Sequence, residues 1–247
     1  MQNQFDPRTT SRSFDPAVSV GVPSVTRDAG LRSYMLKVYN YMASGVLLTG
    51  IIAMLFANSG YAAQVFGGGG ILPWVIILSP LAIVFAMSFG ANRMQTSTLQ
   101  LLFWAFATLM GLSMSTIFLV YTGESIAQTF FAVTAAFAGL SLYGYTTKKD
   151  LSGWGTFLIM GVIGLLVAML LNAFVFQSTA MQMAISAIGV LLFAGLTAYD
   201  TQRIKSMYAH VAGTDMMGKV VILGALSLYL DFINMFQFLL SFMGSRD

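Results

Sequence analysis

The sequence predicts an all-α membrane protein that crosses its bilayer about seven times, and two observations lead to this prediction. The first is composition: of 247 residues, 57% are hydrophobic and only 9% are charged, whereas a soluble domain carries about 25% charged residues. The second is distribution, because residues 38–92 and 151–199 contain no Asp, Glu, Lys or Arg. A helix needs about 20 apolar residues to cross a hydrocarbon core of about 30 Å. Each charge-free stretch therefore holds two spans joined by a short turn.

The chain divides into a polar tail and one membrane domain. Residues 1–30 are rich in Ser, Thr, Pro, Asp and Arg and show no apolar period, so we expect a disordered cytoplasmic tail. Residues 31–247 form the transmembrane domain. Its seven apolar segments are 33–57, 71–92, 98–121, 126–146, 154–177, 182–205 and 217–243. Turn-like sequences separate them, such as the four glycines at 67–70.

The positive charges predict the orientation. Lys and Arg occur in the N-terminal region and then in alternate connections, whereas the intervening connections carry only Glu124. Positively charged connections stay in the cytoplasm, so we expect a cytoplasmic N-terminus. Seven full spans would place the C-terminus outside, whereas a re-entrant last segment would place it inside, and the sequence leaves both open.

Small residues recur at four-residue spacing in two spans: Ala107, Gly111 and Ser115 in the third, and Ala135 and Gly139 in the fourth. Such rows let helix backbones approach closely in lipid, where little hydrophobic force drives helices together. We interpret both rows as helix-packing surfaces.

One carboxylate is predicted to lie deep in the membrane. Asp231 sits about four turns into the last apolar segment, with Gly224, Ser227 and Asn234 on the same narrow helix face. A charged side chain at this depth costs about 2.5–3.5 kcal/mol on insertion scales, so it usually marks a function or a paired site. We expect the face to turn toward the bundle interior, where Asp231 either acts in a function or ties helices together through hydrogen bonds.

A second carboxylate, Asp200, lies at the cytoplasmic end of the sixth span. It can form a helix-end ion pair with Arg203, three residues on. Alternatively, because the last two spans are joined on the cytoplasmic side, Asp200 can approach Asp231, and two such carboxylates titrate as one unit. Arg93, at the cytoplasmic end of the second span, is a candidate cation for this pair. The three residues would form a proton-sensitive latch.

Enzyme functions find little support in the sequence. Cysteine is absent, and the one histidine, His210, falls in a connection, which argues against a serine–histidine dyad inside the bilayer. An intramembrane aspartyl protease is disfavoured as well. Tyr199-Asp200 matches half of its pattern, but Asp231 follows Tyr229-Leu230 in place of Gly-x-Gly, and no proline follows Pro80. We expect no enzyme activity and no resident cofactor.

The membrane domain contains four motifs: Ala225–Asn234 (ALSLYLDFIN) in the last span, Tyr199-Asp200 with Arg203-Ile204-Lys205, Gly111–Ile117 (GLSMSTI), and Lys148–Leu151 (KKDL). They resemble motifs of the Bax inhibitor-1 (transmembrane Bax inhibitor motif) family, in particular its bacterial, YccA-like branch. The similarity covers roughly residues 33–244. The first of these motifs is long and specific.

The resemblance implies a seventh helix surrounded by six others, in a bacterial inner membrane. It also implies a pH-sensitive calcium leak channel with a di-aspartyl sensor at Asp200 and Asp231, Arg93 as their partner, and Ca²⁺ near the two aspartates. A non-conducting regulator that binds a membrane protease or quality-control complex is the alternative. Nucleic acid is not an expected partner. One difference from the family lies in the second span. Some bacterial members carry an acidic residue there, whereas this sequence has the uncharged residues 79–82 (SPLA) in that region.

Overall fold

The computed structural model describes residues 24–245, with side chains from residue 28, and in this part of the chain the secondary structure is helical apart from turns and an isolated bridge residue. The predicted tail falls largely on residues 1–23, which lie outside the described residues. The helices are α1 (Ser24–Asn58), α2 (Tyr61–Gly67), α3 (Leu72–Gly90), α4 (Thr96–Met114), α5 (Ile117–Val120), α6 (Gly123–Thr146), α7 (Ser152–Leu171), the π-helix η1 (Asn172–Phe176), α8 (Thr179–Val211) and α9 (Met216–Met243).

Seven helices of the described chain are long and apolar enough to cross a membrane, in agreement with the prediction. Three details differ. The helix α1 begins at Ser24 and so includes the last seven residues of the predicted tail, 24–30. A short helix, α2, fills the predicted turn between the first two spans. The third span breaks after Met114 and resumes as α5.

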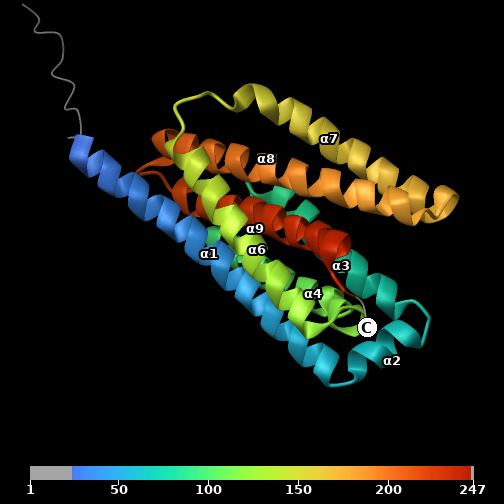
Figure 1. Cartoon of the computed structure of the whole chain (residues 1–247). Helices are drawn as coiled ribbons and strands as arrows, with labels where there is room; N and C mark the ends of the chain where they lie inside the picture. Colours follow the sequence, from blue (N-terminus) through green and yellow to red (C-terminus); the bar gives the residue numbers. More distant parts are fainter. Residues whose placement is uncertain (1–23, 246–247) are drawn as a thin grey trace, which may run out of the picture.

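The helix α9 forms the core of the bundle, which agrees with the predicted central seventh helix. In its most apolar stretch 61% of the residues are buried, against 11–33% in the other six spans of the described chain. It packs against α8, α1, α6 and α4, whereas α3 packs mainly on α4 and α7 mainly on α8. Figure 1 shows α7 on the outer side of α8, away from α1. The six surrounding helices thus cover α9 unequally.

The helix α9 crosses the whole bundle. Its C-terminal end meets the beginning of α6, where the Thr122 N–H donates to the Ser245 carbonyl at 3.2 Å and the Ser245 N–H donates to the Ser125 hydroxyl at 2.8 Å. The turn that precedes α9 lies at the opposite end, because the Lys219 ammonium donates to the Asn92 carbonyl between α3 and α4. The re-entrant alternative is therefore not the observed arrangement.

Small residues allow close contacts between helices. Of the two rows of small residues predicted to do this, only the row in α4 is confirmed. A Cβ on Gly111 would lie 2.8 Å from the Thr49 carbonyl oxygen of α1, and the Thr49 hydroxyl donates to the Ala107 carbonyl at 2.8 Å. The prediction for α6 was wrong, because a Cβ on Gly139 would meet nothing within 4 Å. The tight contact of α6 is at Gly144, where a Cβ would clash with the Ala198 carbonyl oxygen of α8.

The connection between α6 and α7 is fixed to α8. The Gln202 side chain accepts from the Leu151 N–H at 2.8 Å and donates to the Lys149 carbonyl at 2.8 Å. Within the connection, the Ser152 hydroxyl and backbone N–H donate to the Asp150 carboxylate and lower its pKa below the ordinary value. These bonds hold the neighbouring end of α8, which carries Asp200, in one position.

Candidate functional site: a carboxylate pair between the last two spans

The polar face predicted on α9 is the face that packs against α8. Gly224 allows Ile204 of α8 to approach, and Ser227 is the hydroxyl that faces Asp200 of α8. Asn234 lines a small cavity between α7, α8 and α9. Asp231 lies between these positions. The sequence expected this face to turn inward, and the structure identifies α8 as the neighbour that it meets.

Asp231 is buried in the middle of the protein. Its side chain is only 4% exposed, and its Oδ2 atom is buried without a hydrogen-bond donor among the described residues. Fifteen residues of α9 precede it and twelve follow it, which places it roughly 20 Å from either end of the helix. Leaving a polar atom unsatisfied at such a site is costly, so Asp231 needs a further partner.

Asp200 lies across from Asp231 on α8. The two carboxyl groups interact electrostatically, so the charge of one influences the other. The cation that acts on Asp200 is Arg203, and the nearby hydroxyl is that of Ser227. Asp200 thus has a cation one turn along its own helix and a carboxylate on α9 as electrostatic neighbours, while the ion pair with Arg203 and the shared titration with Asp231 stay predictions.

The structure does not bring Arg93 to this pair. Arg93 is exposed in the turn between α3 and α4, and no ion pair joins it to either aspartate within residues 28–245. The adjacent residue, Asn92, bonds Lys219 of α9 at 3.4 Å. Lys219 precedes Asp231 by twelve residues, or about 18 Å along the helix. Arg203 is the cation with an electrostatic influence on Asp200 in this structure, and the assignment of Arg93 stays a prediction.

Polar groups continue from Asp231 toward the C-terminal end of α9. Asn234 and Gln237 line a cavity of about 240 Å³ that also contains Gln182 and Ser241. Gln182 donates to the Ser241 hydroxyl at 3.3 Å and accepts from the buried Asn172 amide at 3.3 Å. The sequence analysis predicted Asn234 but missed Asn172, Gln182, Gln237 and Ser241. The signal was present, since Asn172 and Gln182 are amides within a long apolar, charge-free stretch.

The carboxylate pair supplies hard oxygen ligands for a cation such as Ca²⁺. Asp200, Asp231 and Ser227 bring fewer oxygens than the six to eight that Ca²⁺ usually takes, so water would complete the shell. The described residues contain no group of three or more His, Cys, Asp or Glu side chains suited to a metal ion.

Fold and site together define the class: an integral, multi-pass, all-α membrane protein with a carboxylate pair enclosed between its last two spans. Residues 31–247 match the family described as "Inhibitor of apoptosis-promoting Bax1". The chain belongs to this family, the Bax inhibitor-1 family, as its motifs indicated.

Relatives share most of their length with the chain. "Uncharacterized protein RP147" of Rickettsia prowazekii is 47% identical over 224 residues, covering 90% of this chain and 93% of its own. "Inner membrane protein YbhL" of Escherichia coli strain K12 is 43% identical over 220 residues, covering 88% and 94%. A protein of Caulobacter vibrioides is 44% identical over 247 residues, covering 96% and 98%. The name of the Escherichia coli relative places that protein in an inner membrane.

Proposed function

We propose that this protein is a pH-sensitive calcium leak channel of a bacterial inner membrane, with its N-terminus in the cytoplasm. The observation that carries the proposal is Asp231: a buried carboxylate, one oxygen of which has no hydrogen-bond partner among the described residues, close enough to a second carboxylate for the two to interact electrostatically. A proton or a cation can satisfy that oxygen. Because both bind the same carboxyl groups, the passage of Ca²⁺ becomes dependent on pH.

The polar groups along α9 support a route through the protein. Asp200 and Arg203 lie toward the end of α8 that is predicted to be cytoplasmic, and Asp231 follows near the middle of α9. Beyond it, Asn234 and Gln237 lead into the cavity with Gln182 and Ser241. These residues offer oxygen ligands at successive levels of the membrane, which lowers the cost of moving a partly dehydrated cation. The route requires neither a resident cofactor nor an enzymatic reaction.

Calcium flux through the purified full-length chain tests this proposal. The protein is reconstituted in liposomes that contain a calcium-sensitive dye, and Ca²⁺ entry is measured between pH 6 and pH 8 against protein-free liposomes. We expect flux above the control that changes across this range. Silence at every pH would reject the channel and favour the non-conducting regulator of a membrane protease or quality-control complex.

Two arginine variants distinguish the cation seen beside Asp200 from the one predicted by family resemblance. We expect Arg203→Gln to move the midpoint of the flux–pH curve toward higher pH by roughly half a unit, because an adjacent cation stabilises an ionised carboxylate. Arg93→Gln removes the same charge from an exposed side chain in the turn between α3 and α4 that is not among the groups acting on Asp200, so it should move the midpoint less. The reverse order would assign the pair to Arg93 in the conducting protein.

A further inference from the structure

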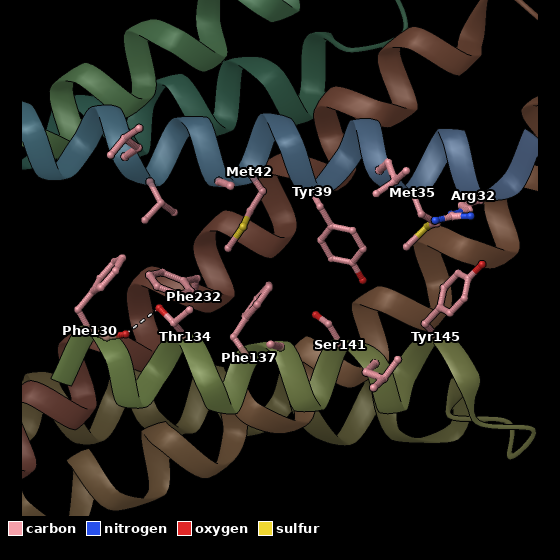
Figure 2. Close-up of a pocket in the computed structure, with 16 residues that line it drawn as sticks. Arg32, Met35, Tyr39, Met42, Phe130, Thr134, Phe137, Ser141, Tyr145 and Phe232 are labelled. Atoms are coloured by element: carbon pink, nitrogen blue, oxygen red, sulfur yellow. Dashed lines mark hydrogen bonds between the residues drawn. The ribbon is translucent and has the colours of Figure 1, made fainter. Parts of the chain in front are cut away.

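A long apolar crevice lies between α1 and α6, on a different side of α9 from the carboxylate pair. It has a volume of about 630 Å³, and Phe232 of α9 closes its inner side. Figure 2 shows side chains of α1 and α6 facing one another across the space, with Met42 and Phe137 from opposite sides. A second cavity of about 310 Å³ shares Val46, Phe130 and Phe232 with the first and extends it along the helices.

The crevice has the length and chemistry of an acyl chain. Its lining runs from Arg32 to Leu47 of α1, a rise of about 22 Å, which exceeds the roughly 15 Å depth of one leaflet of the hydrocarbon core. Exposed apolar side chains flank it, including Leu36, Leu47 and Leu142, at 50%, 64% and 62% exposure. It is therefore accessible sideways, from the region that acyl chains occupy.

The polar side chains that line the crevice already have partners within the protein. The Tyr39 hydroxyl interacts with Ser141 and Thr201, and the Thr201 hydroxyl donates to that of Ser141 at 3.3 Å. Thr134 donates to the Phe130 carbonyl at 2.7 Å, as the dashed line in Figure 2 shows. The crevice between α1 and α6 therefore favours a hydrocarbon occupant over a polar one.

One mouth of the crevice is positively charged. Arg32 and Tyr145 lie together at this end (Figure 2). Lys205 of α8 supports Tyr145: its ammonium donates to the Tyr145 carbonyl at 2.6 Å and lies 4.9 Å from the centre of the Tyr145 ring. Arg32 is exposed and has no ion pair within residues 28–245. A planar guanidinium is well suited to bind phosphate with two parallel hydrogen bonds.

We propose that this crevice is a binding site for one membrane phospholipid, with an acyl chain between α1 and α6 and the phosphate at Arg32. The lipid comes from the leaflet at the Arg32 end, which the distribution of positive charges predicts to be the cytoplasmic one. The chain covers Phe232, the residue after Asp231, so the lipid forms part of the wall around the core helix.

Photocrosslinking in liposomes tests the site. The probe is phosphatidylglycerol with a diazirine in one acyl chain, mixed into phosphatidylcholine liposomes that contain the full-length protein, and adducts are mapped by mass spectrometry. Every lipid-exposed helix will take up some label, so α3, whose apolar side chains are also exposed, supplies the background. We expect adducts at Met42 and Ala138 well above those on α3.

Matched variants separate the site from general contact with lipid. Arg32→Gln should lower crevice labelling about fivefold, in line with the contribution of one basic residue near an anionic surface, whereas Lys37→Gln, which removes a charge from α1 outside the crevice, should not. Ala138→Phe should fill the crevice and reduce labelling to the α3 background. Ala136→Phe places the same ring on an exposed position of α6 outside the crevice and should leave labelling unchanged.

Three results would overturn the proposal. The first is labelling of α1 and α6 no stronger than that of α3. The second is equal labelling in Ala138→Phe and Ala136→Phe. The third is labelling that appears only after deletion of residues 2–23, which would make the N-terminal segment the occupant.

Discussion

We expect Asp231→Asn to lower calcium flux strongly at every pH. The substitution keeps the size of the side chain but removes the negative charge at a buried position in the middle of α9. Even at an effective dielectric constant of 20, a unit charge about 4 Å from a cation contributes several kcal/mol, so flux should fall at least about tenfold. Residual flux should no longer vary between pH 6 and pH 8. The measurement is the liposome dye assay.

Two controls accompany this variant. Asp215→Asn makes the same chemical change at an exposed residue that caps no backbone group through its side chain, and it should conduct like the wild type. The thermal midpoint of Asp231→Asn in detergent should stay equal or rise, because a buried, poorly partnered carboxylate is costly in the folded state. A variant that keeps wild-type flux and wild-type pH dependence would contradict the di-aspartyl sensor. A large loss of stability would instead make Asp231 a structural tie between helices.

The second large effect concerns stability at the contact between α6 and α8. We expect Gly144→Ala to lower the free energy of unfolding by about 1–3 kcal/mol, as overpacking does in tightly packed cores, and the thermal midpoint by about 2–12 °C. The added Cβ would clash with the Ala198 backbone carbonyl, and that backbone has no side-chain freedom with which to move away. The midpoint can be followed by loss of the monodisperse peak after heating in detergent.

The matched control is Gly139→Ala on the same helix. A Cβ at this position meets nothing within 4 Å, and alanine is favoured over glycine inside a helix by about 1 kcal/mol. Its midpoint should therefore stay the same or rise. If both variants were equally stable, the helices could separate at Gly144 at little cost, and the described contact between α6 and α8 would not limit stability.

Local patterns in the sequence predicted the spans and the polar face of α9. Whether a segment crosses a membrane depends on about 20 consecutive residues, and whether Gly224, Ser227, Asp231 and Asn234 share a face depends only on the helical period. Both properties belong to single helices, so they can be deduced without knowing how the helices pack. The same holds for Asp231, whose cost in an apolar segment is a property of that segment.

Only the tertiary structure decided which groups meet. The neighbouring cation of Asp200 is Arg203, although the motifs pointed to Arg93. The tight glycine of α6 is Gly144, although the spacing pointed to Gly139. The polar cavity beside Asn234 and the crevice between α1 and α6 also depend on residues far apart in the chain. Hydropathy and period give the length and faces of each helix, but in lipid the choice of neighbour depends on close packing and a few hydrogen bonds, which appear only when the helices are assembled.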